Sequence, residues 1–336
     1  MRVTVITEPH QVQIAERPTP EPAAGEALIR VRAVGLCGSD VHAFEGTHPF
    51  VTYPIVPGHE VCGDLVEARG DCGLAVGERV VLDPGLRCGR CYACRHGRSN
   101  ACVQMACLGA HLDGACAEYV TLPLANVHRA PAGSSDIEAA ITETFSIGMQ
   151  ANIRGRVAPE DQALILGAGP IGLACLMVAR GRGARCAVVD VMASRRDKAR
   201  ALGAEQAWDP RGDDVAAAAL AWTGGDGPGV VMEAVGREPT YRQALELVAP
   251  AGRVVLLGLM AGEVTLPAAV FVKKELDVLG SRLNSGSFPE VIRLIESGVL
   301  QPAALVSHTL PLADCPAALA LAAEGREDVL KVVLVA

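Results

Sequence analysis

Two residues near the start of the chain have the chemistry to bind a metal ion. Cys37 lies in Gly35-Leu36-Cys37-Gly38-Ser39-Asp40-Val41-His42, and His59 lies in Pro57-Gly58-His59-Glu60. A thiolate and an imidazole are good zinc ligands, and each is followed by an acid that could orient a ligand. A cysteine and a histidine at such a separation are more often unrelated core residues. The pair therefore becomes informative only together with other features of the chain.

Four cysteines form a more specific pattern, because Cys88, Cys91, Cys94 and Cys102 follow the spacing C-x2-C-x2-C-x7-C. Four thiolates in one loop can complete a tetrahedral shell around zinc and leave no position for a substrate. Disulfides and an iron–sulfur cluster are the alternatives. Twelve cysteines in a chain whose start does not resemble an export signal favour metal over disulfides. We interpret the cluster as a structural zinc site in a lobe at about 84–106.

The turn Gly167-Ala168-Gly169-Pro170-Ile171-Gly172 has the spacing of a dinucleotide-binding motif. It follows an apolar strand predicted at 163–166 and begins a helix predicted at 171–180. Gly167, Gly169 and Gly172 would let the backbone turn tightly and approach a pyrophosphate at the N-terminus of that helix, where Pro170 and Ile171 lie. A glycine turn with a purely structural role is the alternative.

Asp190 ends the next predicted strand and bears on the choice of cofactor. Its carboxylate would accept hydrogen bonds from an adenosine ribose and repel a 2′-phosphate, which favours NAD over NADP. Ser194, Arg195 and Arg196 favour the opposite choice, because arginines beside this acid could bind a phosphate.

The elements around these motifs change character along the chain. Up to about residue 150, short strands predicted at 3–6, 27–32, 78–82 and 117–120 indicate an irregular β-barrel or sandwich. From about residue 151, apolar strands alternate with Ala-rich helical segments, a pattern typical of a parallel sheet covered on both faces. An amphipathic helix beginning near residue 288 and a strand at 329–335 end the chain.

Composition excludes several classes of protein. Half of the 336 residues are hydrophobic and 20% are charged, which favours a globular protein of two domains over a disordered one. The net charge of −8 argues against binding of nucleic acid or of an acidic membrane. The uncharged run at 162–179 is short and broken by glycines, so we expect no membrane span and a cytoplasmic location.

Together these features resemble the zinc-dependent medium-chain dehydrogenases of the alcohol dehydrogenase superfamily, above all the polyol and sugar-acid branch with sorbitol and threonine dehydrogenases. A narrower likeness, to bacterial proteins of the starvation-sensing and galactonate-dehydrogenase type, rests on Gly280-Ser281-Arg282-Leu283-Asn284, Phe288-Pro289 and Ser307-His308-Thr309. The resemblance implies an α/β protein. A GroES-like, β-rich catalytic domain would comprise 1–147 and 282–336, and a Rossmann NAD-binding domain with a doubly wound parallel sheet would comprise 148–281.

The resemblance also implies the ligands of a catalytic zinc. Cys37 and His59 match the first two ligands of the family. Glu143 is the candidate for the third, because Glu143-Thr144-Phe145-Ser146-Ile147-Gly148 matches the family's ligand segment, although Thr144 replaces the usual proline. Some relatives exchange a ligand at the position of Glu60, which we expect to be a neighbouring or transient ligand.

An ion with three protein ligands keeps a position for a substrate alcohol, lowers its pKa and favours hydride transfer to a nicotinamide. In the family's pattern, Ser39 and His42 form the proton relay to solvent, and Asp40 holds the ring of His59 in the metal-binding tautomer. A turn hydroxyl is the alternative for Ser39, and a surface histidine is the alternative for His42.

Three further residues, Phe44, His48 and Arg282, fall where the family's substrate residues lie. Arg282 could pair with a sugar-acid carboxylate, or it could face the cofactor or solvent. We therefore predict an oxidoreductase with two zinc ions per chain that transfers hydride between a secondary alcohol of a polyol or sugar acid and NAD. A threonine or other amino-alcohol dehydrogenase, or a non-catalytic regulatory protein with this fold, are the alternatives.

The expected partner is a small alcohol or ketone. We also expect a homodimer or homotetramer, because the family pairs the edge strand predicted at 276–280 across a twofold axis.

Overall fold

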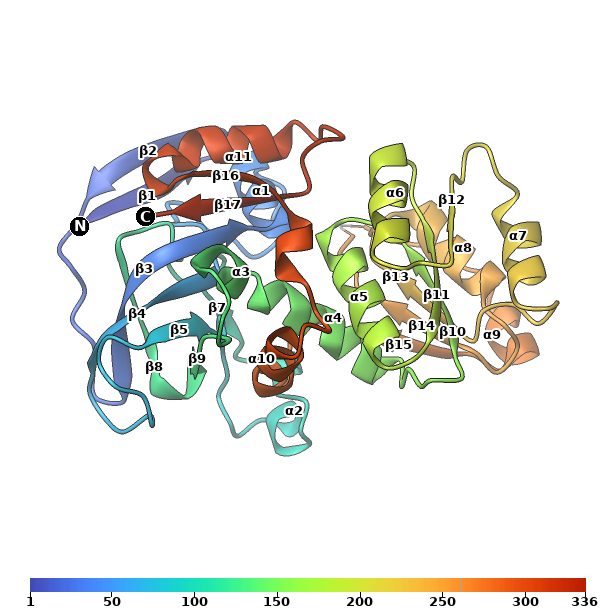
Figure 1. Ribbon diagram of the computed structural model, residues 1–336, viewed down its shortest axis with the longest axis horizontal. Helices are drawn as coiled ribbons and strands as arrows, with labels where there is room; N and C mark the ends of the chain where they lie inside the picture. Colours follow the sequence, from blue (N-terminus) through green and yellow to red (C-terminus); the bar gives the residue numbers. More distant parts are fainter. Residues whose placement is uncertain (261) are drawn as a thin grey trace. The chain divides into compact units, whose positions relative to one another are not determined.

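The computed structural model describes residues 1–260 and 262–336 and contains two compact units. The first unit comprises Met1–Glu143 and Ser285–Ala336, and the second comprises Thr144–Asn284. Both ends of the chain therefore belong to the first unit, as the blue and red parts of Figure 1 show. The second unit is an insertion between the two parts of the first.

A seven-stranded sheet organises the first unit. Its order is β16-β17-β3-β4-β5-β9, with β8 also paired to β3. The strand β3 pairs antiparallel with β4, β8 and β17, whereas β16 and β17 are parallel. The C-terminal β17 thus lies beside β3 from the start of the chain (Figure 1). The strands are β3 (Glu26–Leu36), β4 (Glu60–Ala68), β5 (Arg79–Leu82), β8 (Tyr119–Pro123), β9 (Val127–Arg129), β16 (Val306–Pro311) and β17 (Lys331–Val335).

Shorter elements complete this unit. Two small antiparallel pairs are β1 (Arg2–Glu8) with β2 (Gln11–Glu16), and β6 (Gly85–Leu86) with β7 (Ala106–Cys107). The α-helices are α1 (Gly38–Glu45), α2 (Tyr92–Arg95), α3 (Asp136–Ala140), α10 (Phe288–Glu296) and α11 (Cys315–Ala323). The 3-10 helices are η1 (Ser99–Ala101), η2 (Leu124–Asn126), η3 (Pro302–Leu305) and η4 (Leu312–Asp314).

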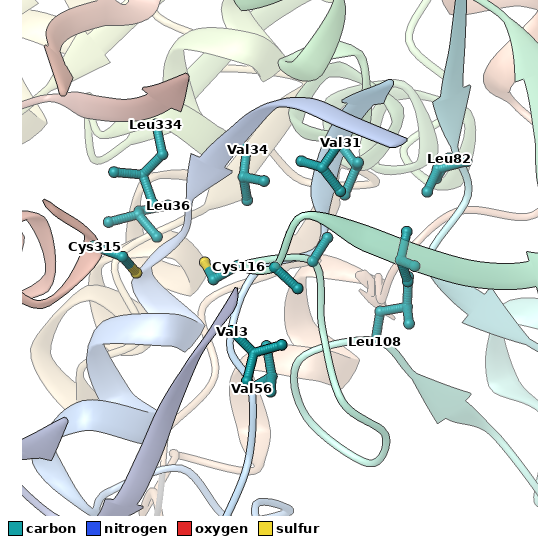
Figure 2. Packing of buried hydrophobic residues seen from close by; sticks show 14 of the residues in the cluster. Val3, Val31, Val34, Leu36, Val56, Leu82, Leu108, Cys116, Cys315 and Leu334 are labelled. Carbon is teal, nitrogen blue, oxygen red and sulfur yellow. The ribbon is translucent and has the colours of Figure 1, made fainter. Parts of the chain in front are cut away.

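The core of the first unit consists of small aliphatic side chains. Figure 2 shows valines and leucines of β1, β3, β5 and β17 packed together, with the sulfur atoms of Cys116 and Cys315 facing each other. The aromatic content of the chain is 3%, so valine, leucine, isoleucine and alanine side chains fill the space between the strands. This core supports the ends of β3, β4 and β17, where the chemically interesting residues lie.

The second unit contains a six-stranded parallel sheet, as the alternating pattern predicted. Its order is β12-β11-β10-β13-β14-β15, and every neighbouring pair is parallel. The order reverses at β10, so the crevice at the ends of β10 and β13 is the expected ligand site of such a sheet. The strands are β10 (Gln162–Leu166), β11 (Arg185–Val189), β12 (Gln206–Trp208), β13 (Val230–Glu233), β14 (Arg253–Leu256) and β15 (Asp277–Gly280).

Helices cover both faces of this sheet. Leu164 and Leu166 of β10 belong to a buried cluster that includes residues of α7 and α8. Ile165 faces the opposite side, where a Cβ added at Gly172 of α5 would lie 3.4 Å from its Cγ2 atom. The helices are α4 (Thr142–Arg154), α5 (Pro170–Gly181), α6 (Ala193–Ala201), α7 (Val215–Trp222), α8 (Glu238–Leu247) and α9 (Ala269–Lys274). Among the residues described, no helix is long and apolar enough to cross a membrane.

Candidate active site and metal centres

Cys37 and His59 come together because each lies at the end of a strand in the same sheet. Cys37 follows β3 and is the N-cap residue of α1, while His59 immediately precedes β4. Since β3 and β4 pair antiparallel with Gly35 opposite Glu60, the two ligand candidates meet at one edge. Their metal-binding atoms and those of Glu60 all lie within 4.8 Å of one another.

The carboxylate of Asp40 fixes the backbone on both sides of this group. Its Oδ2 atom accepts a hydrogen bond from the N–H of Cys37 (2.9 Å), and its Oδ1 atom accepts one from the N–H of Gly58 (2.7 Å). Its distance to Nδ1 of His59 is 3.8 Å, which is too long for a hydrogen bond. Asp40 therefore orients the two chain segments directly and the ring of His59 through charge.

A buried ion pair that the sequence did not lead us to expect completes the group. Nζ of Lys331, the first residue of β17, lies 2.6 Å from Oε1 of Glu60. The side chains are 2% and 0% exposed. Burial lowers the pKa of Lys331, but Glu60 and Cys37 raise it more, so the net pKa lies above its usual value. Lys331 therefore keeps its positive charge beside Glu60.

The second oxygen of Glu60 is directed away from this lysine. Oε2 is buried and has no hydrogen-bond partner among the residues described. A Cβ added to Gly35 would lie only 2.1 Å from it, so a side chain at position 35 would displace the carboxylate. An unpaired buried carboxylate oxygen is costly in free energy. Because a carboxylate oxygen of Glu60 lies within 4.8 Å of the metal-binding atoms of Cys37 and His59, a cation is the natural partner of this group.

Glu143 lies at the start of α4, is 3% exposed and is outside the 4.8 Å group of described residues. Burial raises the pKa of Glu143 to about 7, with His59 and Lys331 lowering it and Glu60 raising it. Burial also lowers the pKa of His59, but Asp40, Cys37 and Glu143 outweigh burial and raise it well above 6.5. The carboxylates of Asp40 and Glu143 thus both favour a positive charge at His59.

The donor set fits zinc. One thiol, one imidazole and the carboxylate of Glu60 converge beside Lys331, and a thiolate with imidazole and carboxylate ligands suits zinc. A divalent ion would neutralise the negative donors that burial otherwise penalises. Cys37, His59, Glu60 and Glu143 are the residues that could hold it.

The residues predicted for the proton relay lie on α1. Ser39 is partly exposed, and the side chain of His42 is 58% exposed. Nδ1 of His42 lies 3.0 Å from the hydroxyl of Thr47 and 3.8 Å from a carboxylate oxygen of Glu45. His42 therefore reaches solvent while remaining on the helix that Cys37 caps.

Two of the predicted substrate residues lie in the first unit and the third in the second. Phe44 meets the ring of His10 edge-on at 5.1 Å. His48 accepts a hydrogen bond from the N–H of Phe50, and burial lowers the pKa of His48. Arg282 is exposed and belongs to the second unit. Their role in substrate binding stays a prediction.

The four cysteines of the lobe form a separate metal-binding group. The sulfur atoms of Cys88, Cys91, Cys94 and Cys102 all lie within 4.8 Å of one another. Backbone N–H groups lower the pKa of Cys91 to about 6, and Cys102 accepts hydrogen bonds from two backbone N–H groups at 3.3 Å. A thiolate is thus stabilised before any metal binds, and the set fits a closed zinc site.

The glycine-rich turn has the geometry that its spacing predicted. A Cβ at Gly172 would lie 1.8 Å from the carbonyl oxygen of Gly167, so this approach requires glycine. Gly169 caps α5 with Pro170 in its first turn, and a Cβ there would meet nothing within 4 Å. The open space above a helix N-terminus fits the pyrophosphate of a dinucleotide.

Asp190 follows β11 and is 7% exposed. Its Oδ2 atom accepts a hydrogen bond from the N–H of Ala168, within the glycine turn, and its Oδ1 atom accepts one from the N–H of Met192. Arg196 pairs with Asp209 and the carbonyl oxygen of Asp190, so it is already engaged. Arg195 has a buried Nε atom with no partner among the residues described.

Sequence reasoning missed Lys331 and Gly35. Lys331 belongs to the strand that we predicted at 329–335, where it is the one charged residue among aliphatic ones. A charge within a buried strand was the available signal, but its partner Glu60 is 271 residues away. Gly35 gave no signal beyond its place before Cys37.

Comparison with known proteins agrees with this geometry. A model of the alcohol dehydrogenase GroES-like domain matches residues 23–132, and a model of zinc-binding dehydrogenases matches residues 170–297. L-galactonate-5-dehydrogenase of Escherichia coli K12 is 35% identical over 316 residues, which cover 93% of this chain and 92% of that protein.

Two solved structures share the fold. The alcohol dehydrogenase rspB of Escherichia coli CFT073, complexed with NADH, has a TM-score of 0.93 and 34% identity, covering 100% of this chain and 99% of that one. A zinc-binding dehydrogenase of Sinorhizobium meliloti 1021, bound to NADP, has a TM-score of 0.92 and 30% identity with the same coverage. Similarity therefore extends over both units.

Proposed function

This chain belongs to the zinc-dependent alcohol dehydrogenase superfamily, and on that premise we propose that it oxidises a secondary alcohol of a polyol or sugar acid with NAD. The predictions of a GroES-like domain with a Rossmann domain, and of a zinc- and nicotinamide-dependent oxidoreductase, are confirmed. The choice of substrate and of NAD over NADP belongs to the proposal.

The close group of Cys37, His59 and Glu60, together with the buried Glu143, is the observation that carries the proposal. Cys37, His59 and Glu143 would hold the catalytic zinc, with Glu60 as the neighbouring carboxylate. Zinc and NAD, when bound, supply a Lewis acid that lowers the pKa of the substrate hydroxyl and an acceptor for its hydride.

Glu60 and Lys331 tune the charge of this site. Nζ of Lys331 lies 2.6 Å from Oε1 of Glu60, and a carboxylate oxygen of Glu60 lies within 4.8 Å of the metal-binding atoms of Cys37 and His59. Lys331 would balance the charge of Glu60 beside a cation held by Cys37, His59 and Glu143. This supports the predicted role of Glu60 as a neighbouring or transient ligand.

His42 would pass the proton of the substrate hydroxyl to solvent. Its ring is largely exposed and contacts the hydroxyl of Thr47, while the helix α1 begins at Cys37. A histidine titrates near neutral pH and can both accept and release a proton there. Ser39, on the same helix, would be the inner member of the relay.

NAD is favoured by Asp190. The carboxylate is buried next to the glycine turn and bonds to the N–H of Ala168, so its negative charge lies beside the site of the dinucleotide. A 2′-phosphate would be repelled by this charge. Arg196 is engaged by Asp209, which leaves Arg195 as the arginine that could oppose this preference.

A sugar acid or polyol is favoured over an amino alcohol by the relative L-galactonate-5-dehydrogenase, which is similar across both units. Arg282 is exposed and carries the charge that would pair with a substrate carboxylate.

We further propose a homodimer or homotetramer that pairs through β15, the edge strand of the parallel sheet. A cytoplasmic location suits twelve free thiols.

A single screen tests the proposal. Reduction of NAD and of NADP would be followed with hexitols, pentitols, aldonates and L-threonine as substrates. We expect turnover with a polyol or an aldonate, and a lower Michaelis constant for NAD than for NADP. A preference for L-threonine would mean that the substrate is an amino alcohol and not a polyol or sugar acid. No turnover with any compound, by protein that carries zinc in both sites, would contradict the proposed activity.

A further inference from the structure

Glu233 is a fully buried carboxylate that the proposed chemistry does not use. It is the last residue of β13, is 0% exposed and lies in register between Leu166 of β10 and Leu256 of β14. Its position is therefore the carboxyl edge of the sheet, beside the point where the strand order reverses. A charge buried here is costly unless it is well bonded.

One oxygen of Glu233 organises the turn that follows it. Oε1 accepts hydrogen bonds from the N–H groups of Val235 (2.9 Å) and Gly236 (2.8 Å) and from the hydroxyl of Thr240 (2.7 Å). Three donors on one carboxylate oxygen are a strong, directional restraint. The other oxygen, Oε2, is buried with no partner among the residues described. The carboxylate thus links the turn at 234–236 to the start of α8 by hydrogen bonds.

This turn contacts the glycine motif on one side. A Cβ added to Gly167 would lie 2.7 Å from Cγ2 of Val235 and 3.4 Å from the backbone of Ala234. The N–H of Ala234 also bonds to the carbonyl oxygen of Leu166, the residue before the motif. The first glycine of the dinucleotide turn therefore rests directly on the segment that Glu233 holds.

On the other side, the turn contacts the end of β14. A Cβ at Gly258 would lie 2.1 Å from the backbone nitrogen of Gly236 and 2.7 Å from Oε2 of Glu233. Tyr241 donates a hydrogen bond from its hydroxyl to the carbonyl oxygen of Gly258 (2.6 Å). The turns after β10, β13 and β14 are thus packed backbone to backbone, with Glu233 between them.

We propose that Glu233 is a positioning residue for the dinucleotide site: its carboxylate sets the turn at 234–236, against which Gly167 and the phosphate-binding turn are held. This inference rests on the proposed use of a nicotinamide dinucleotide. Glu233 would act through Val235 and Gly236, whose N–H groups it binds. Loss of the carboxylate would let the three turns separate and raise the dissociation constant of the cofactor without altering the chemical step.

The test compares Glu233→Ala, Glu233→Gln and a matched control, Val231→Ala, in the full-length zinc-loaded enzyme. Val231 is buried on the same strand, so the control weakens the same sheet without removing a hydrogen bond to the turn. The dissociation constant of NADH would be measured by titration calorimetry, with kcat and KM for NAD from initial rates.

We expect Glu233→Ala to raise the dissociation constant of NADH and KM for NAD about tenfold or more, as loss of hydrogen bonds to a charged group implies. The value of kcat at saturating NAD should stay within about twofold. Glu233→Gln keeps an acceptor oxygen and should recover most of the affinity, and Val231→Ala should bind NADH like the wild type.

Equal NADH affinity in Glu233→Ala, Val231→Ala and the wild type would overturn the inference. If Glu233→Ala does not fold, Thr240→Val, which removes one donor to the same oxygen, takes its place. A rise of about threefold in the NADH dissociation constant then supports the inference, and no change overturns it. If the wild type itself binds neither NADH nor NADPH, the proposed function fails, which is a distinct result.

Discussion

The two candidate metal centres of this enzyme are built in opposite ways. The lobe draws four cysteines from one short segment, all with the same ligand chemistry. The catalytic group draws Cys37, His59, Glu60, Lys331 and the candidate ligand Glu143 from separate parts of the chain, and it combines a thiol, an imidazole, two carboxylates and an ammonium group. The lobe could form with little help from the rest of the fold, whereas the catalytic group requires β3, β4, α4 and β17 to be in place.

This difference explains what each centre can do. Four thiolates saturate a tetrahedral ion, so the lobe can only stabilise structure. The catalytic group has fewer soft ligands and a carboxylate, Glu60, whose charge is balanced by Lys331 rather than by the metal alone. Such a site would offer a bound ion a further carboxylate beside its three candidate ligands, and it buries several charges.

The largest expected effect comes from His59→Ala. Removing this ligand should lower kcat at least about 1,000-fold, because transition-state stabilisation by the Lewis acid is lost. The lobe should keep its zinc. Steady-state kinetics with the best substrate from the screen measures the effect. Activity within tenfold of the wild type would show that the chemistry does not depend on this group.

Lys331→Met tests the buried ion pair that distinguishes the catalytic group from the lobe. It leaves Glu60 without its partner, and we expect the free energy of unfolding to fall by about 3–5 kcal/mol. The double variant Glu60→Gln with Lys331→Met should be more stable than the single variant, because neither charge then remains unpaired. Chemical denaturation of Lys331→Met, Glu60→Gln and the double variant provides the measurement. Additive losses would contradict a coupled ion pair.

Cys102→Ser tests the lobe as a purely structural centre. Cys102 is 4% exposed and accepts two backbone hydrogen bonds. We expect loss of the lobe zinc and a fall in Tm of roughly 4–10 °C, while kcat of the folded protein changes little. Calorimetry and initial rates check both parts. A folded variant without turnover would mean that the lobe shares in catalysis.

A smaller effect is expected for His42→Ala, which would interrupt the proton path from α1. Turnover should fall about tenfold at low pH, where other proton acceptors are scarce, and recover as pH rises. The control is His96→Ala, an exposed histidine in the lobe. The pH dependence of kcat distinguishes the two. An unchanged profile for His42→Ala would remove it from the relay.

The smallest expected effect concerns Glu143 in zinc-free protein. Burial raises the pKa of Glu143 to about 7 from the usual 4.5. Between these values the folded protein binds more protons than the unfolded chain, so this residue favours folding at low pH and the contribution is lost as pH rises toward about 7.

Glu143→Gln should remove that dependence. The Tm of the zinc-free wild type, taken relative to that of zinc-free Glu143→Gln, should therefore fall as pH rises from about 5 to about 8. Both proteins would be treated with the same chelator, so loss of the lobe zinc is common to them. A constant difference across this range would contradict a raised pKa for Glu143.

The features that sequence revealed are those encoded within short segments. The spacing of Cys88 to Cys102 and of Gly167 to Gly172 carries its own geometry, since each segment folds against itself. The parallel sheet was predictable from apolar strands that alternate with helices. Such local patterns can be recognised without knowledge of the tertiary structure.

The features that sequence did not reveal depend on pairing between distant strands. Lys331 reaches Glu60 only because β17 pairs with β3, and β3 pairs with β4. Glu233 was not noticed because two of its three partners are backbone N–H groups, which any sequence supplies. Asp40 was expected to hold the ring of His59, yet its hydrogen bonds go to the backbone of Cys37 and Gly58.

The most direct test of the account is the zinc content of the wild type and of Cys37→Ser, measured by native mass spectrometry. The account predicts two zinc ions per chain in the wild type, one in each group, and one in Cys37→Ser, retained by the lobe. A single zinc in both proteins would contradict it, because the buried group of Cys37, His59 and Glu143 would then not be a metal centre.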